Sequence, residues 1–252
     1  RRFISQQALE VYTIPRPSVP RISLVTDSIG SESLFGGVGT ALLFSAQLAN
    51  QMNATLRVVT RTEVPSPANA WQILNAYGIQ LQQEIQFAFA PLKSDETDAS
   101  PVVEAAPGLD IHPDEIFVTT SWWTTAATLP SVPAASIIYL LQEDERMFYP
   151  FGEDRVHCER VLRNQDIRFV VNTRLLYDHL MATGLAHLGR NGFWFEPAFP
   201  KSLFHPRPRE ANGKKRFFFY ARPNNPRNLF QIGLGVIDHA VNEGILDLEQ
   251  WE

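Results

Sequence analysis

Residues 22–60 read ISLVTDSIGSESLFGGVGTALLFSAQLANQMNATLRVVT, and this stretch decides the fold class. Residues 22–26 form a short apolar run of the kind found in buried strands, and a glycine-containing loop follows. Residues 40–50 then place apolar side chains at helical spacing, and residues 55–60 are a second apolar run. A strand, a helix and a strand of these lengths predict a right-handed βαβ crossover.

The same alternation continues along the chain. Further strands are predicted at residues 86–90, 114–119, 136–141, 168–171, 193–195 and 216–221, and helices at 68–77, 124–129, 156–163, 175–182 and 229–242. Unbroken apolar strands that alternate with helices predict an α/β fold, a doubly wound parallel sheet of the Rossmann-like type. Residues 91–113 are rich in Pro, Asp, Glu and Ala, and we expect an exposed loop there.

The pattern divides the chain into three parts. Residues 1–20 hold three prolines and no clear periodicity, which indicates an arm or linker. Residues 21–213 carry the N-terminal Rossmann-like domain. Residues 214–252 offer one strand, one helix and a tail, too little for an independent core. They either pack onto the first sheet or begin a second domain, and we expect the second.

Composition excludes several classes of protein. With 22 Lys and Arg against 27 Asp and Glu the formal net charge is −5, so no basic field favours nucleic acid. The single cysteine, Cys158, excludes an intrachain disulfide and a Cys-only zinc site. The histidines are scattered without HExxH spacing, so we predict no metal site. No apolar run approaches the roughly 20 residues of a membrane span, and residues 1–20 do not resemble a signal peptide, so we expect a cytoplasmic protein.

Candidate ligand-binding residues follow from the rule that such sheets bind ligands beyond the carboxyl ends of their strands. Gly36 and Gly37 lie in the first strand-to-helix turn, where they would let backbone amides approach an anion, or would serve the turn alone. The cluster at residues 142–145, Gln-Glu-Asp-Glu, follows a strand and is suited to a base, a hydroxyl acceptor or a metal ligand, or is a solvated turn. Trp122 and Trp123 either fill space or stack on a sugar ring.

A second candidate loop follows the strand predicted at 216–221. Arg222 and Arg227 stand five residues apart across a Pro/Asn turn and could clamp a diphosphate, or the loop is a charged turn with Asn228 as a helix cap. The chain has no G-x-S-x-G elbow and no Walker loop, which excludes a serine hydrolase of that type and a P-loop NTPase.

Several short segments occur together in the order of a known family. They are Gly36-Gly-Val-Gly-Thr-Ala41, Thr120-Ser-Trp-Trp-Thr124, Tyr139-Leu-Leu-Gln-Glu-Asp-Glu-Arg-Met-Phe-Tyr-Pro150, Asn172-Thr173, Trp194-Phe-Glu-Pro197 and Phe219-Tyr-Ala-Arg-Pro223. Through them the chain resembles the retaining glycosyltransferases of the GT-B fold, family 4 type, and most closely the bacterial rhamnosyltransferases of S-layer glycan and rhamnan synthesis.

The resemblance implies an enzyme with two Rossmann-like domains that face a cleft. Residues 21–213 would be the acceptor-side domain, and residues 214–252 the start of the donor-binding domain. The enzyme would move a hexose, such as the deoxyhexose L-rhamnose, from a nucleotide-diphosphate sugar to a growing surface polysaccharide. No cofactor or metal is implied. The glycan acceptor would be free or lipid-linked, the latter with peripheral association at the inner face of the cell membrane.

The resemblance also implies roles for single residues. Arg222 and Arg227 match the spacing of the family's diphosphate contacts, with Arg227 in place of a lysine, and Asn228 adjoins them. Gly36 and Gly37 match the turn near the donor phosphate and the acceptor.

Gln142 stands where many members of the family have histidine. Glu145 matches the closer relatives, which read Gln-Asp-x-Glu, and Glu143 departs conservatively from them. With Gln142, these glutamates are the catalytic candidates. The family's Glu-x7-Glu region is not among residues 214–252. We therefore expect the isolated chain to fold but not to catalyse sugar transfer.

Two alternatives stay open. The first is a non-catalytic GT-B-like domain that serves as an interaction module in a glycan-assembly protein. The second is another Rossmann enzyme such as a nucleotide-sugar epimerase, against which the absence of G-x-G-x-x-G and Tyr-x-x-x-Lys argues.

Overall fold

The computed structural model describes residues 6–31, 36–92, 108–199, 201, 204–206, 213–223 and 228–252. The chain forms two compact units, Arg1–Phe199 and Pro200–Glu252. The strands of the first unit are β1 (Val11–Thr13), β2 (Arg21–Thr26), β3 (Thr55–Thr60), β4 (Ile85–Phe89), β5 (Leu109–Ile111), β6 (Ile116–Thr119), β7 (Ile137–Leu141), β8 (Arg168–Asn172) and β9 (Gly192–Phe195). Its α-helices are α1 (Gly37–Met52), α2 (Pro67–Ala76), α3 (Trp122–Thr128), α4 (Glu153–Leu162), α5 (Arg174–Ala182) and α6 (Leu188–Asn191), with 3-10 turns at Ala134–Ser136 and Glu145–Phe148.

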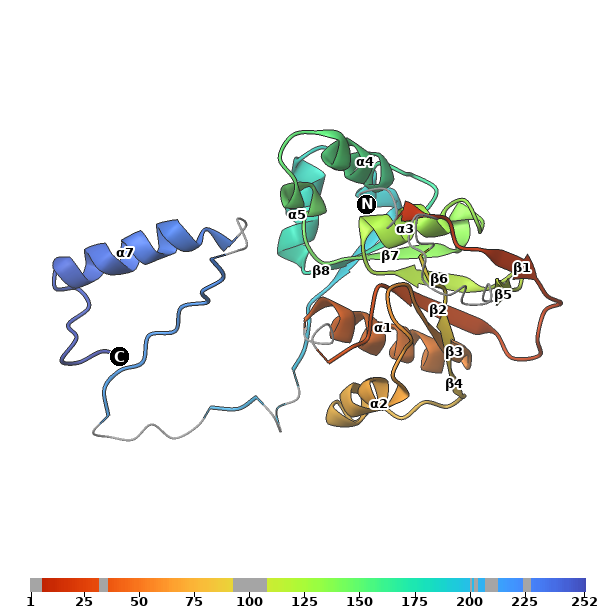
Figure 1. The fold of residues 1–252 in the computed structure, drawn as a ribbon, viewed down its shortest axis with the longest axis horizontal. Coiled ribbons are helices and arrows are strands. Elements are labelled where there is room, and N and C mark those ends of the chain that lie inside the picture. The colour runs from red at the N-terminus through yellow and green to blue at the C-terminus, as the bar shows by residue number, and fades with distance from the viewer. Residues whose placement is uncertain are drawn as a thin grey trace, which may run out of the picture. The chain divides into compact units, whose positions relative to one another are not determined.

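Seven parallel strands form the main sheet in the order β4-β3-β2-β6-β7-β8-β9 (Figure 1). The chain starts this sheet at β2, runs outward through β3 to β4, returns to the other side of β2 as β6, and runs outward again to β9. This reversal of direction is the mark of a doubly wound sheet. The predicted α/β, Rossmann-like fold is confirmed.

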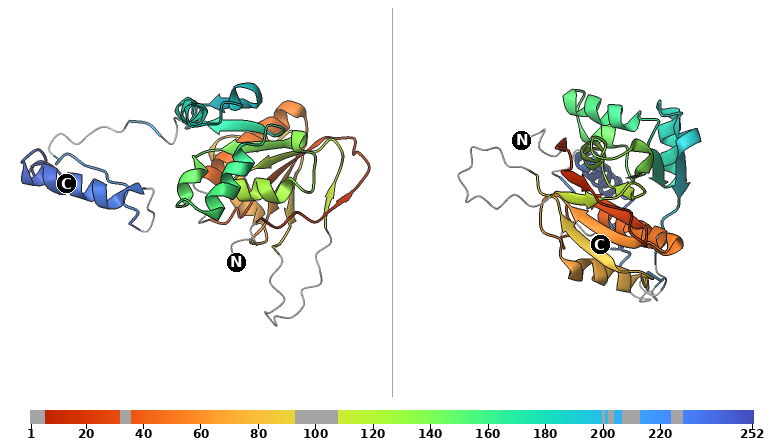
Figure 2. Two further views of the ribbon diagram at one scale, coloured as in Figure 1. Left: turned by 90° about the horizontal axis from the view of Figure 1, so that it is seen from above. Right: turned by 90° about the vertical axis from the view of Figure 1, so that its right-hand side faces the viewer.

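Helices cover both faces of the sheet, because its strands turn apolar side chains alternately to either side (Figures 1 and 2). Leu24 of β2 packs in the cluster formed with α1 and α2, whereas its neighbour Val25 packs in the cluster formed with the later helices. Residues of both clusters are almost completely buried. The central strands are therefore mainly apolar, as the sequence indicated, with Arg21, Ser23 and Arg57 as buried polar exceptions.

Two short strands form where the sequence predicted none. β1 and β5 pair in parallel, Val11 opposite Leu109 and Thr13 opposite Ile111. Leu9, Leu109 and Ile111 are buried in the core of the first unit. Both short strands are therefore packed onto that core. Three-residue strands carry no readable periodicity, so the patterns at 1–20 and 91–113 indicated only an arm and a loop. Residues 93–107 of that expected loop lie outside the described residues.

Helix α1 begins three residues earlier than predicted. Gly36 caps it with φ 88° and ψ −119°, in the region of positive φ that favours glycine. Gly37 and Gly39 therefore belong to the first turn of the helix, and of these glycines only Gly36 lies in the turn before it.

In the second unit, the predicted helix is confirmed as α7 (Phe230–Asn242), but the strand predicted at 216–221 is absent. A strand needs a continuous backbone partner, and the described residues of this unit offer one only at Lys215–Phe217. There Lys215 N donates to Gln250 O at 2.7 Å and Phe217 N to Glu252 O at 2.8 Å. The ring of Phe219 instead packs on that of Phe230, with centroids 5.7 Å apart.

Buried charges join the amino ends of the central strands. The Glu115 carboxylate, with a fully buried side chain, accepts hydrogen bonds from Arg21 Nη2 at 2.8 Å and Arg57 Nη2 at 2.6 Å. Both arginines also bond to Asp110, at 2.7 and 2.9 Å. The two arginines and two carboxylates thus compensate one another's charges, with Glu115 fully buried and Asp110 partly exposed.

We expect Glu115→Gln to lower the free energy of unfolding by about 3–5 kcal/mol, because it leaves the buried arginines short of one negative charge. Urea denaturation followed by tryptophan fluorescence measures the change. The matched control is Glu159→Gln, which breaks the more exposed 2.7 Å pair with Arg163 and should change stability by about 0.5 kcal/mol or less. Equal, small losses for both variants would contradict the assigned role of the buried network.

Candidate functional site

A pocket of about 240 Å³ lies at the carboxyl ends of β2, β6 and β7. We call it the carboxyl-edge pocket. It is lined by Thr26, Asp27, Ser28, Gly37, Val38, Thr120, Ser121, Trp123, Gln142, Glu143, Glu145 and Phe148. β2 and β6 are the neighbouring strands from which the chain departs in opposite directions. In open α/β sheets, ligands bind at this switch point.

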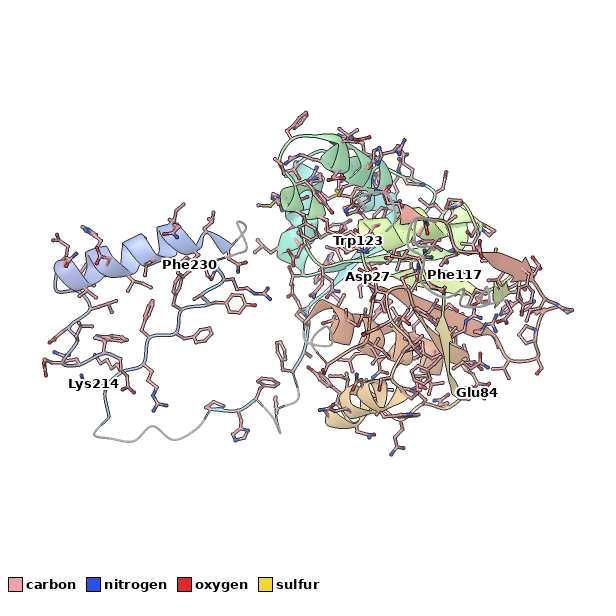
Figure 3. The ribbon with its side chains drawn as sticks, in the orientation of Figure 1. Asp27, Glu84, Phe117, Trp123, Lys214 and Phe230 are labelled. Carbon is pink, nitrogen blue, oxygen red and sulfur yellow. The ribbon has the colours of Figure 1, made fainter. Side chains whose placement is uncertain are left out.

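Asp27, the first residue after β2, supplies a carboxylate to the pocket. Its Oδ2 accepts a hydrogen bond of 2.8 Å from the indole Nε1 of Trp123, at the start of α3 (Figure 3). Partial burial raises the pKa of the Asp27 carboxyl, and the Trp123 bond and the Arg61 charge oppose that rise. Asp27 was not among the site residues predicted from the sequence. The available signal was its position, since it is the first charged residue beyond an apolar strand.

Glu145 is the buried carboxyl of the site. It is 4% exposed, and its Oε2 accepts a 2.8 Å hydrogen bond from the backbone N of Trp122, the first residue of α3. Burial raises the pKa of Glu145 from 4.5 to about 8, and the nearby charges of Asp27 and Asp144 act in the same direction. Glu145 is therefore largely protonated at neutral pH, and it positions α3 rather than supplying a second charge to the pocket.

The remaining members of the predicted cluster at 142–145 point to different partners. Gln142 Nε2 donates to the carbonyl of Gly37 at 2.7 Å, and its Oε1 accepts from Asn172 Nδ2 at 3.3 Å. Gln142 thus ties the end of β7 to the start of α1 and the end of β8. Glu143 is exposed at the lining of the pocket. Asp144 instead bonds to Arg146 and His179 at 2.7 and 3.1 Å.

The glycine turn reaches the same pocket. Gly37 and Val38 line it, so the first turn of α1 brings backbone N–H groups to its wall. A Cβ atom at Gly37 would lie 3.1 Å from Gln142 Nε2, closer than an ordinary contact. The structure therefore brings together Gly37, Gln142, Glu143 and Glu145 from the predicted set, with Gly36 as the cap that starts the helix.

The predicted arginine loop belongs to the second unit. Arg222 is exposed, and its guanidinium lies over the ring of Tyr220, 5.5 Å from the centroid. Asn228 is half-buried shortly before α7. Arg227 lies outside the described residues.

Within the described part of the chain, no group of three or more His, Cys, Asp or Glu side chains comes together in a way that could hold a metal ion. No described helix combines the length and the apolar character needed to cross a bilayer.

We expect stability to report the protonation of Glu145. The folded state holds a proton that the unfolded state releases, so the contribution of Glu145 is fully present below pH 4.5 and is lost as the pH rises through about 8. Glu145→Gln mimics the protonated form and removes this dependence. The unfolding free energy of the wild type minus that of Glu145→Gln should fall between pH 5 and pH 9, by on the order of 5 kcal/mol at full ionisation. A difference that stays flat across this range would show that Glu145 is ionised in the folded protein.

The chain is similar to proteins of one family along both units. The family domain described as "WsaF, N-terminal domain" matches residues 21–174, and "WsaF, C-terminal domain" matches residues 215–252. A relative, the "O-antigen biosynthesis protein RfbC" of Myxococcus xanthus, is 37% identical over 122 residues, which are 48% of this chain and 9% of that protein. These matches support the expected relationship to a glycosyltransferase family. Because the N-terminal match alone spans more than half of the residues, the chain belongs to the WsaF family.

Proposed function

We propose that this chain is part of a glycosyltransferase that moves a hexose from a nucleotide-diphosphate sugar to a hydroxyl group of a growing surface polysaccharide. The observation that carries the proposal is the carboxyl-edge pocket, which joins a carboxylate, amide groups and a helix N-terminus at the switch point of the sheet. The family match and the RfbC relative support the choice of polysaccharide synthesis. The chain spans 9% of that relative, so the activity of a whole protein is part of the proposal.

The finer assignments follow the family resemblance. They are a GT-B arrangement, a deoxyhexose donor such as an L-rhamnose nucleotide, and retention of the anomeric configuration. The reaction would need no cofactor beyond the donor substrate. The protein would act in the cytoplasm, free or at the inner face of the membrane beside a lipid-linked acceptor.

Asp27 is the group best placed to bind a sugar hydroxyl. Trp123 holds one of its oxygens at 2.8 Å, which fixes the direction of the other. An ionised carboxylate accepts stronger hydrogen bonds from hydroxyl groups than a neutral acceptor does. Glu143 and Gln142 stand beside it in the lining and would orient further hydroxyls. Trp123 presents an indole ring to the same space, and aromatic rings pack well on the apolar faces of sugars.

Catalysis in this proposal is mainly electrostatic. As the glycosidic bond to the donor breaks, the sugar gains positive charge and the diphosphate gains negative charge. We assign the stabilisation of the diphosphate to Arg222 and Arg227, whose planar guanidinium groups match phosphate oxygens. At Gly36 and Gly37, the first turn of α1 offers backbone N–H groups and the positive end of a helix dipole to a phosphate or a hydroxyl.

The test of the function is a transfer assay on a full-length protein that contains this chain, with a panel of nucleotide-diphosphate hexoses. Arg222→Ala should lower kcat/KM by about 10²–10³, corresponding to about 2.7–4 kcal/mol of lost charge stabilisation. Arg222→Lys should recover part of the loss, because lysine restores the positive charge but lacks the planar guanidinium group that can donate two hydrogen bonds to a phosphate. The matched control is Arg216→Ala in the same unit, an exposed arginine that pairs with Glu252 at 3.0 Å and should leave turnover unchanged.

Two outcomes would contradict this assignment. If Arg222→Ala lowered stability but left the folded fraction as active as the wild type, Arg222 would have a structural role only. If the folded wild type turned over no donor and bound none, the non-catalytic interaction module would be the better account.

We expect Gly37→Val to weaken transfer without unfolding the protein. The side chain would force Gln142 from its 2.7 Å bond with the Gly37 carbonyl and reshape the pocket. A displacement of this kind costs about 10²-fold in kcat/KM when the site orients a substrate. Gln51→Val, on an exposed position of the same helix, is the matched control. If Gly37→Val had wild-type activity, Gly37 would matter only for the geometry of the turn and not for substrate binding.

A further inference from the structure

Three exposed side chains come together on the same edge of the sheet as the carboxyl-edge pocket, where β8 and β9 end. They are Arg174, the first residue of α5, Trp194 of β9, and Glu196 just after β9. The Arg174 guanidinium lies over the Trp194 ring, 5.6 Å from its centroid, and Glu196 Oε1 accepts a 3.0 Å hydrogen bond from Arg174 N. We call these three residues the Trp194 platform.

An unusual backbone conformation at Thr173 positions the platform. Its φ of 102° and ψ of 150° lie in a region that residues other than glycine rarely adopt. Three hydrogen bonds hold it there: Thr173 N donates to Phe195 O at 3.0 Å and to Val171 O at 3.2 Å, and Thr173 Oγ1 accepts from Leu176 N at 3.2 Å. The turn brings the start of α5 next to the end of β9. Strained backbone of this kind clusters at sites that bind ligands.

The platform is open to solvent and keeps hydrogen-bonding capacity. Trp194 is 44% exposed, and the side chain of Arg174 is 66% exposed. Arg174 Nε lies 3.5 Å from Asp178 Oδ2, but its two terminal nitrogens and Glu196 Oε2 form no hydrogen bond with the described residues. The platform therefore offers an aromatic ring, N–H donors and a carboxylate acceptor side by side.

These groups match the surface of a sugar. A sugar ring presents C–H groups on its faces, which pack on aromatic rings, and hydroxyl groups at its rim, which both donate and accept hydrogen bonds. Trp194 would carry the face of the ring, Arg174 would donate to one hydroxyl and Glu196 would accept from another. Because Glu196 and Asp178 place negative charge beside Arg174, the platform does not favour a phosphate.

A run of hydrogen bonds connects the platform to the carboxyl-edge pocket. Gln142, in the pocket lining, accepts from Nδ2 of Asn172, the last residue of β8, at 3.3 Å. Thr173 follows Asn172 and donates to Phe195 O of β9. Neighbouring strands of a sheet lie about 4.8 Å apart, so the ends of β7 and β9 are separated by about 10 Å. A linear oligosaccharide can therefore reach from the pocket to the platform.

We propose that the Trp194 platform binds a further sugar residue of the glycan acceptor whose end lies in the carboxyl-edge pocket. This inference rests on the proposed function and names a class of substrate for it, an acceptor that is already an oligosaccharide. The growing polysaccharide would lie along the carboxyl ends of β7, β8 and β9.

The test is an NMR titration of the chain, ¹⁵N-labelled at its tryptophan indoles, with linear trisaccharides of rhamnose, mannose and glucose and with the matching methyl glycosides. We expect at least one trisaccharide to shift the signals of both Trp123 and Trp194 saturably. Its methyl glycoside should leave the Trp194 signal in place, because only a linked sugar gains the effective concentration that the pocket supplies. Trp194→Ala assigns the signal and should weaken trisaccharide binding about 5–10-fold.

Conservative variants separate stacking from a merely structural role. Trp194→Phe should keep most of the affinity, because it retains an aromatic face, whereas Trp194→Leu should not. The matched control is Phe193→Ala on the same strand, which should bind the trisaccharide as the wild type does. Phe193 is 75% exposed, but it points to the other face of the sheet, as does Phe195, which stacks on Phe44.

The proposal is overturned if folded Trp194→Ala binds the trisaccharide as tightly as the wild type, or if the methyl glycoside moves the Trp194 signal as far as the trisaccharide does. Should Trp194→Ala fail to fold, Arg174→Ala replaces it, and unchanged affinity in that variant contradicts the proposal.

The two indole signals also separate this proposal from the proposed function. Movement of Trp123 without Trp194 would leave the pocket as a sugar site and remove the platform. Movement of Trp194 without Trp123 would overturn the continuous acceptor site. If no ligand moved either signal, the platform and the sugar-binding role of the pocket would both be contradicted.

Discussion

The reversal of chain direction at β2 is the constraint on which the candidate site depends. The chain leaves β2 toward β3 on one side and later returns to place β6 on the other side. The helices that follow β2 and β6, α1 and α3, pack in the clusters on opposite faces of the sheet. The connections therefore diverge above the two strands and cannot fill the space between them. The carboxyl-edge pocket is this space. Its lining comes from the end of β2, the residues just after β2, β6 and β7, the first turns of α1 and α3, and the 3-10 turn Glu145–Phe148.

Among the described residues, two buried glutamates lie at opposite ends of the central strands, and each is stabilised in a different way. Glu115, at the amino ends of the strands, accepts hydrogen bonds from two arginines. Glu145, at the carboxyl ends, accepts a hydrogen bond from a backbone N–H of α3, and burial raises its pKa to about 8. The first arrangement holds strands together by paired charges. The second leaves Asp27 and Glu143, rather than Glu145, as the carboxylates available to a ligand in the pocket.

The overall fold was predictable because the central strands β2, β3, β6 and β7 are largely buried on both faces. Such strands appear in the sequence as mainly apolar runs, and the intervening helices show their own spacing. β1 and β5 were missed because three residues cannot show a period, and their pairing joins segments about a hundred residues apart. The strand predicted at 216–221 has the right composition, but its described unit offers few backbone partners. An apolar run indicates that a segment could form a strand, but not whether a neighbouring backbone is present to pair with it.

The site was predictable in position but not in detail. The rule that ligands bind at the carboxyl ends of strands selected the loops after β2 and β7, and residues of both loops line the carboxyl-edge pocket. It could not predict which side chains of the acidic cluster at 142–145 face the pocket. Asp144 is oriented by hydrogen bonds with Arg146 and His179, and Glu145 by one from Trp122 N. These contacts depend on the packing of α3 and α5, which local sequence does not encode. The same packing places Trp123 on Asp27 and explains why this residue emerged only from the structure.

The indole N–H signal of Trp123 tests the central claim most directly, because this group donates to Asp27 inside the carboxyl-edge pocket. The measurement is an NMR titration of the ¹⁵N-tryptophan-labelled chain with an oligosaccharide acceptor from a surface glycan. We expect the Trp123 signal to move saturably, while that of Trp71 on α2, outside the pocket, stays in place. Saturable binding of the same oligosaccharide that leaves Trp123 unmoved would contradict the assignment of this pocket as the sugar-binding site.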